Sequence, residues 1–131
     1  MSQSTAPVVD APPYEVIGGE ASLRRLVNRF YDIMESDPAA TSLRAMHAAD
    51  LGPMRKHLFE FMSGWMGGPR LYSNCVVGAH AHLRIGEAER DQWLQCMRQA
   101  MAEQAVPEPM RALMDSAFAR MADAFVSRDS H

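Results

Sequence analysis

The chain is 131 residues long, with 47% hydrophobic residues, 22% charged residues and a formal net charge of −3. Both fractions lie near the average for globular proteins, so we expect one soluble domain with a single core and neither a disordered nor a membrane protein. Basic residues are scattered among acidic ones, which predicts no extended positive face and argues against a nucleic-acid partner.

The first residues hold three prolines and show no helical or strand periodicity. We therefore expect residues 1–13 to form a disordered N-terminal tail, residues 14–127 to form the domain and residues 128–131 to form a short C-terminal tail. No basic stretch followed by an apolar one opens the chain, and apolar runs are short. This pattern predicts no secretory signal, no membrane-spanning helix and a cytoplasmic protein.

Four long helices are predicted from apolar residues that recur at three- and four-residue spacing. The first begins near Glu20 and ends near Ser36, and the second follows a predicted N-cap at Asp50 and ends at the Gly67-Gly68 pair. The third runs through Trp93 and Met101, and the fourth runs from Met110 to Phe125, with Leu113 in its apolar stripe. Short helical turns are expected around Leu43 and at residues 77–82. The predicted class is all-α, without strands or internal repeats.

Neither histidine nor cysteine spacing predicts a zinc site. The five histidines are His47, His57, His80, His82 and His131. They include no pair at the i, i+4 spacing of a helical zinc site, and there is no Cys-x-x-Cys. Cys75 and Cys96 are expected to be reduced thiols, and Cys75 would be reactive if exposed.

Four segments, in order, resemble group II of the truncated haemoglobins. The most specific is a histidine followed by two spacers, Leu, one spacer and Ile, and then by an Arg-Asp-x-Trp-Leu-x-Cys-Met helix. In this sequence the matching segments are Tyr14 to Gly19, Arg29-Phe30-Tyr31, Trp65 to Tyr72, and His80 to Met97. The resemblance implies a truncated globin fold, a two-over-two helical sandwich around one haem b (iron protoporphyrin IX).

In this family a proximal histidine binds the haem iron, and the His-x-x-Leu-x-Ile spacing places that role on His80. A neutral imidazole nitrogen facing an apolar slot is a good ligand for haem iron. His82 is expected to face solvent or to lie near a haem propionate.

Two distal hydrogen-bond donors follow from the same resemblance. Tyr31 matches the distal tyrosine and Trp93 the distal tryptophan. Iron-bound dioxygen carries partial negative charge, so a phenol O–H and an indole N–H can donate to it. A hydrogen bond to a charged acceptor contributes about 1.5–3 kcal/mol. Each donor should therefore slow the escape of the ligand roughly ten- to a hundredfold. Without the resemblance, both residues read as core aromatics whose polar tips are bonded elsewhere.

The resemblance also implies further haem contacts. His47 matches a position that holds Phe, Tyr or His against the haem, with Met46 as the competing assignment. Met54 and Leu58 match inward positions of the next helix, with Phe61 as another apolar contact, and Met54 could act as a gate. The candidates for the haem propionates are His57, Tyr72 and Arg84.

The match departs from the family before His80. Only residues 73–79 separate Tyr72 from the histidine, fewer than the family usually has, and an arginine is lost. We expect a reshaped proximal side and altered propionate contacts.

The expected function is reversible binding of dioxygen and other diatomic ligands such as NO and CO, with slow oxygen release. Slow release argues against simple oxygen transport and favours redox or detoxification chemistry with an unidentified reductase, in a monomer or a homodimer. The alternatives are a peroxidase-like enzyme that uses His47, Tyr31 and Trp93, a haem-based sensor, and a helical interaction protein that has lost its cofactor.

Overall fold

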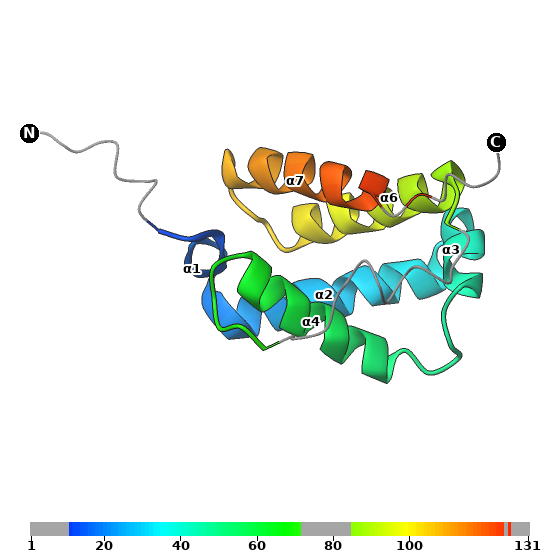
Figure 1. The fold of residues 1–131 in the computed structure, drawn as a ribbon, viewed down its shortest axis with the longest axis horizontal. Helices are drawn as coiled ribbons and strands as arrows, with labels where there is room; N and C mark the ends of the chain where they lie inside the picture. Colours follow the sequence, from blue (N-terminus) through cyan, green and yellow to red (C-terminus); the bar gives the residue numbers. More distant parts are fainter. Residues whose placement is uncertain (1–10, 72–84, 125, 127–131) are drawn as a thin grey trace, which may run out of the picture.

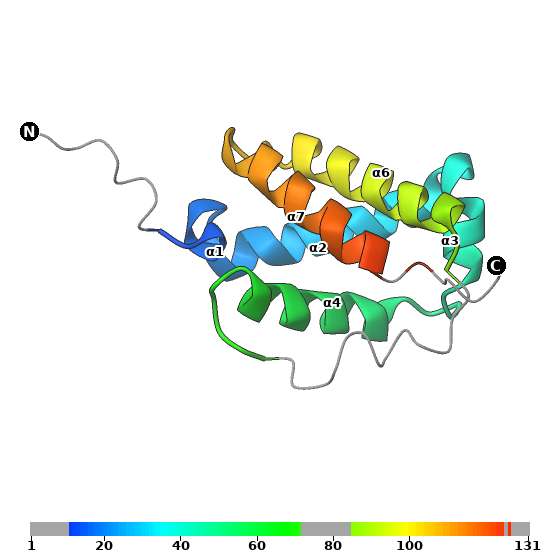
Figure 2. The ribbon, with the colours of Figure 1, turned by 45° about the horizontal axis from the view of Figure 1, so that its top comes forward.

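Four long helices form two antiparallel pairs. In a computed structural model, which describes residues 11–71, 85–124 and 126, α2 (Gly19–Ser36) pairs with α4 (Gly52–Trp65), and α6 (Glu87–Glu103) pairs with α7 (Met110–Ala124). The two pairs form two layers in Figure 1 and stay distinct in the turned view of Figure 2. Three short elements complete the described fold: α1 (Pro13–Val16), η2 (Pro38–Ala40) and α3 (Thr41–Ala45).

The all-α class predicted from the sequence is confirmed, since no strand occurs among the described residues. The predicted turn around Leu43 is α3, whereas the one expected at residues 77–82 lies outside the described ranges. None of the described helices combines the length and the apolar character needed to cross a membrane.

Helix α2 occupies the centre of the molecule. It packs against α6 on one side and α4 on the other, and it also contacts α1 and α3. Its buried residues keep the three- and four-residue spacing that predicted the helix: Leu23, Leu26, Val27, Phe30, Tyr31, Ile33 and Met34. The core continues through Met97, Ala100 and Met101 of α6 and through Phe118 of α7.

Two predicted details of the helices are wrong. The N-cap of α4 is Leu51 and not Asp50, because the chain already turns into the helical region at Leu51; the Asp50 carboxylate instead accepts the N–H of Gly52 at 2.9 Å. Leu113 is 62% exposed, because α7 buries a line of residues at four-residue spacing that starts one residue later, with Met114, Phe118 and Ala122.

The Gly67-Gly68 turn fastens α1 to the end of α4. Gly67 has a φ of 89°, a left-handed conformation that suits glycine. The N–H of Tyr14 donates to the carbonyl of Met66 at 2.9 Å, and the Tyr14 ring lies so close to Gly68 that a Cβ there would be 2.5 Å from it. The hydroxyl of Ser63, which is fully buried, donates to the carbonyl of Pro69 at 2.7 Å. The helix end predicted at the Gly67-Gly68 pair therefore has a geometric basis.

Candidate functional site

Tyr31 carries a buried hydroxyl that has no hydrogen-bond partner among the described residues. Its position on the inner face of α2 leaves it only 3% exposed. Burial raises the pKa of the phenol far above its usual value, although the charge of Arg55 opposes the rise. The phenol is therefore a neutral donor at any physiological pH. A buried hydroxyl without a partner costs about 1–3 kcal/mol, so this phenol is a candidate to donate to a bound group.

Trp93 approaches the same region from α6 and is packed against the core. The ring of Phe30 contacts both aromatics, with its centroid 4.9 Å from that of Tyr31 and 5.0 Å from that of Trp93. No acceptor among the described residues binds the indole N–H of Trp93. Phe118 of α7 also contacts Trp93, with ring centroids 5.5 Å apart, and so helps to hold the indole in place.

His47 lies in the segment that joins α3 to α4 and meets Tyr31 edge-on, with ring centroids 6.0 Å apart. Its Nδ1 lies 2.9 Å from the carbonyl oxygen of Leu43. A carbonyl only accepts, so Nδ1 carries a proton and Nε2 of the neutral ring is the acceptor nitrogen. Met46, the competing assignment, is the C-cap of α3 and is half-buried like His47. The ring contact with Tyr31 favours His47.

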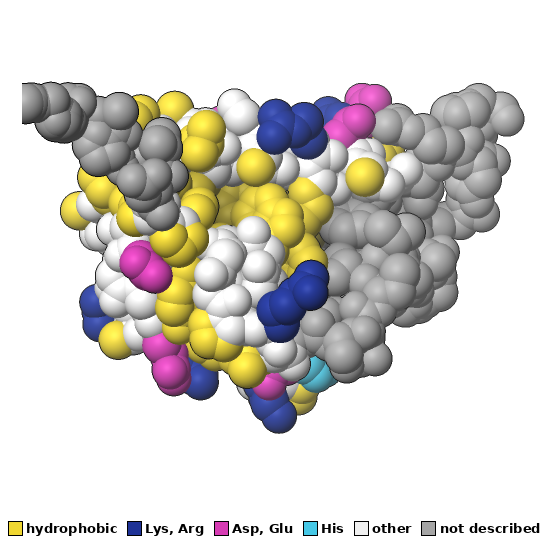
Figure 3. All heavy atoms as spheres, turned by 60° about the vertical axis from the view of Figure 1, so that its left-hand side comes forward, with side chains coloured by type: hydrophobic (Ala, Val, Ile, Leu, Met, Phe, Trp, Pro, Cys, Tyr) yellow, Lys and Arg dark blue, Asp and Glu magenta, His cyan; other side chains and the backbone are white. Residues whose placement is uncertain are grey.

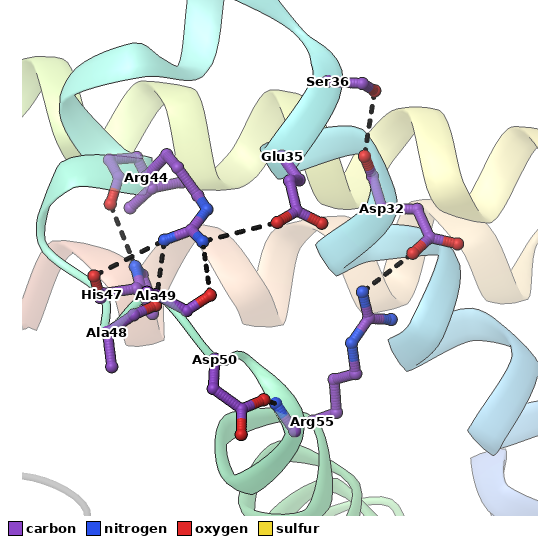
Figure 4. A network of polar contacts seen from close by, with 11 residues as sticks. Asp32, Glu35, Ser36, Arg44, His47, Ala48, Ala49, Asp50 and Arg55 are labelled. Atoms are coloured by element: carbon purple, nitrogen blue, oxygen red, sulfur yellow. Dashed lines mark hydrogen bonds and ion pairs between the residues drawn. The ribbon is translucent and has the colours of Figure 1, made fainter.

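Arg44 holds the segment that carries His47 (Figure 4). Its guanidinium donates to the carbonyls of Ala48 and Ala49, each at 3.0 Å, and to that of His47 at 3.4 Å. Glu35 of α2 pairs with the same guanidinium at 3.4 Å. One charged side chain thus satisfies three consecutive carbonyls that no helix pairs, and it fastens them to α2.

Arg55 joins α4 to α2 beside Tyr31. It donates to the backbone carbonyl of Asn28 at 2.9 Å and to the carboxylate of Asp32 at 2.8 Å, and the latter contact is drawn in Figure 4. Its guanidinium carbon lies 5.8 Å from the centroid of the Tyr31 ring, within the range of a cation–π contact. Arg55 therefore supports the ring whose hydroxyl is the candidate donor.

The inward residues predicted on α4 are half-buried against the core: Met54, Leu58 and Phe61. His57, proposed for a propionate, is exposed on the same helix. Figure 3 shows the end of the molecule that lies on the left in Figure 1, and apolar side chains gather in a band across it. Trp65 is 38% exposed at this end of α4, stacks on Phe61 and contacts the ring of Phe118 at 4.9 Å.

The predicted proximal side lies outside the described residues. This applies to His80 and His82, to Tyr72 and Arg84, and to Cys75 in the shortened segment. On the described side, Phe30 contacts Tyr31 and Trp93, and His47 contacts Tyr31, whereas His57 lies at the surface. Sequence reasoning missed Phe30, Arg44 and Arg55. Phe30 could have been found from its place in the Arg-Phe-Tyr motif. The two arginines contact residues of other elements, and no characteristic sequence spacing marks such contacts.

The donor set fits a haem pocket whose bound ligand has a partial negative charge. Two donors that have no acceptor in the described part of the chain, the Tyr31 O–H and the Trp93 N–H, come from helices of different layers, and half-buried apolar side chains of α4 pack against the same core. An apolar slot with a few convergent donors is the usual form of a cofactor site.

Comparisons with known proteins agree with the resemblance to the truncated haemoglobins. The model of the bacterial-like globin family matches residues 13–127. The group 2 truncated hemoglobin YjbI of Bacillus subtilis (strain 168) is 33% identical over 94 residues, which cover 68% of each chain. Among solved structures, the group II 2-on-2 hemoglobin of Agrobacterium tumefaciens is 34% identical with a TM-score of 0.86, covering 98% of this chain and 100% of that one.

The cold-adapted truncated hemoglobin of Pseudoalteromonas haloplanktis TAC125 gives the same identity, 34%, and the same TM-score, 0.86, over 90% of this chain and 99% of that one. The resemblance seen in the sequence is confirmed, and so is the two-over-two arrangement of the helices. Membership of this family implies haem-based binding of small gas ligands. The chain belongs to the bacterial-like globins, as a truncated haemoglobin of group II.

Proposed function

We propose that residues 14–127 bind one haem b through His80 and hold dioxygen at the iron with Tyr31 and Trp93 as donors. The observation that supports this most is the buried hydroxyl of Tyr31, which has no acceptor among the described residues. Bound haem supplies an iron that takes diatomic ligands, dioxygen, NO and CO among them, and that can exchange electrons.

The proposed site has three groups of residues with different roles. Met54, Leu58 and Phe61 supply an apolar wall that excludes water, and Tyr31 and Trp93 supply hydrogen bonds to the negative end of the ligand. His57, Tyr72 and Arg84 are the proposed partners of the propionates. Two donors together slow oxygen release, so a redox or detoxification task fits the site better than oxygen delivery. We place the protein in the cytoplasm, with an unidentified reductase as its partner.

A peroxidase-like activity is the second candidate, and the position of His47 favours it. The imidazole lies against Tyr31, and Nε2 of the neutral ring can accept a proton. Steady turnover with hydrogen peroxide that falls in His47→Leu, with oxygen binding retained, would support this activity. Turnover unchanged by the substitution would exclude His47 from it.

The test of the principal proposal is a titration of the purified protein with haemin, followed by ultraviolet-visible absorption. The wild type should take up one haem with a Soret band and form stable oxy and carbonmonoxy states. His80→Ala should lose or grossly alter this spectrum, whereas His82→Ala, two residues away, should keep it. Failure of the wild type to bind haem stoichiometrically would overturn the proposed function, and an unchanged spectrum in His80→Ala would overturn the ligand assignment.

A further inference from the structure

A groove of about 190 Å³ lies between α2 and α4, on the same two helices that carry Tyr31 and Met54 but lined by other residues. We name it the α2–α4 groove. Its lining consists of Arg24, Val27, Asn28, Gly52, Arg55, Lys56 and Phe59. None of these residues is a proposed haem contact, so the function proposed above does not account for the groove.

The lining has three cations and no carboxylate. The guanidinium carbon of Arg24 lies over the Phe59 ring, 4.0 Å from its centroid, and Nε of Arg24 is paired with Glu20 outside the lining. Lys56 has no ion-pair partner among the described residues. A concave surface lined by one sign of charge concentrates ions of the opposite sign.

The start of α4 carries two of these cations. A helix N-terminus carries partial positive charge and usually has acidic residues in its first turn, but α4 has none there. Arg55 and Lys56 follow within the next residues instead. The Asp50 carboxylate outside the lining satisfies the N–H of Gly52 but leaves the charges of both side chains in place. A bound anion would add to the compensation of the helix dipole that the Asp50 carboxylate already provides.

Neutral donors are present as well. The side-chain oxygen of Asn28 accepts from Arg55 at 3.3 Å, so its amide N–H₂ group is directed away from that guanidinium. No acceptor among the described residues binds this amide. Lys56, Arg24 and Asn28 therefore offer donors from two helices to an anion in the groove.

We propose that the α2–α4 groove binds a small multivalent oxyanion of the phosphate or diphosphate class. The groove is too small for a folded chain, and its volume lies below the range of drug-sized pockets. Several tetrahedral oxygens match a set of donors that comes from two helices, whereas a single halide would satisfy only one or two of them.

Arg55 links this groove to the oxygen site. The same guanidinium lines the groove, pairs with Asp32 and lies over the ring of Tyr31. An anion in the groove competes with Asp32 for Arg55 and so draws support away from the Tyr31 ring. Occupation of the groove should therefore lower oxygen affinity. This consequence depends on the proposed function, but binding of the anion does not.

The direct test is isothermal titration calorimetry of the full chain with inorganic pyrophosphate, against sodium chloride at matched ionic strength. Saturable binding at one site is expected, weakened about tenfold or more in Lys56→Gln and in Arg24→Gln. Arg98→Gln is the matched control, because Arg98 pairs with Asp115 between α6 and α7, away from the groove, and should bind as the wild type does. Circular dichroism checks that each variant is folded.

Absence of saturable pyrophosphate binding, or equal weakening in all three variants, would overturn the proposal. The coupling is tested separately by oxygen equilibrium curves of the haem-loaded protein. Saturating pyrophosphate should lower the oxygen affinity about fivefold, and the oxy form should bind pyrophosphate more weakly than the deoxy form by the same factor. An unchanged oxygen curve with pyrophosphate bound would overturn the link through Arg55. A chain that takes up no haem would refute the proposed function, while calorimetry still decides the groove.

Discussion

The imidazole of His47 meets the ring of Tyr31 at an angle of 77°, and the Nδ1–H of the imidazole is committed to the carbonyl of Leu43. The edge contact and the Arg55 guanidinium on its face hold the Tyr31 ring in place, although its hydroxyl has no partner among the described residues. The phenol is thus positioned for a ligand. Without a bound ligand, its unsatisfied hydroxyl lowers the stability of the protein.

Tyr31→Phe should therefore change stability and ligand binding in opposite directions. Without haem, the variant should be as stable as the wild type or up to about 1–3 kcal/mol more stable, because an unsatisfied hydroxyl is removed. With haem, oxygen should dissociate about ten- to a hundredfold faster. Urea denaturation of the haem-free protein and stopped-flow oxygen release measure the two effects. A clear loss of stability in the haem-free variant would mean that the hydroxyl has a protein partner.

Arg44→Gln should loosen the segment from His47 to Ala49, because three carbonyls lose a charged donor. We expect a loss of about 1–2 kcal/mol in the free energy of unfolding, measured by urea denaturation, and faster amide exchange in this segment. Arg111→Gln serves as the control, since its i, i+3 pair with Glu108 is a surface contact that contributes at most about 0.5 kcal/mol. Equal losses in the two variants would contradict the role of Arg44.

Gly68→Ala should destabilise the protein, since the added Cβ would lie 2.5 Å from ring carbons of Tyr14 that cannot move without the whole ring. The expected cost is about 1–3 kcal/mol. Gly64→Ala is the matched control four residues earlier. Its Cβ would make an ordinary contact of 3.4 Å with Arg70, and alanine favours the helix by up to about 1 kcal/mol. Thermal denaturation should show a lower melting temperature for Gly68→Ala. The melting temperature of Gly64→Ala should be raised or unchanged.

Cys96 should make stability fall at alkaline pH. Burial raises the pKa of its thiol to about 11 from an ordinary value of 9.0, with the charge of Asp37 as a smaller cause. The native state thus favours the protonated thiol, and this contribution is complete below pH 9 and is lost as the pH rises towards 11. In a Cys75→Ser background, the stability difference between the chain with Cys96 and its Cys96→Ala variant should narrow over this interval by at most about 2 kcal/mol. A constant difference would indicate an unshifted thiol.

The helices could be predicted from the sequence because an apolar face repeats at the helical period. Leu23 to Met34 show this directly, and the structure buries that same face. The N-cap of α4 was predicted one residue early, because Asp50 has the side chain of a cap while the backbone of Leu51 decides where the helix begins. Leu113 was wrongly placed inside because an exposed apolar residue beside a buried line satisfies the same spacing.

The candidate site was predictable where it depends on motif positions. Tyr31, Trp93 and His47 came from the family resemblance, and a chain of ring contacts links them, from Trp93 through Phe30 and Tyr31 to His47. Arg44 and Arg55 were not predictable, since each acts through contacts with residues of another element, which no local spacing encodes. The role of His80 stays a prediction that the haem titration will decide.

Uneven packing divides the described helices into parts of unequal stability. Helix α2 contacts α1, α3, α4 and α6, whereas α4 has α2 as its principal neighbour among the described elements. Hydrogen exchange in α2 should thus require global unfolding, while α4 can separate as a unit of lower free energy. Such a partial opening would expose the apolar wall formed by Met54, Leu58 and Phe61. A flat, bulky cofactor could then enter and leave without the rest of the molecule coming apart.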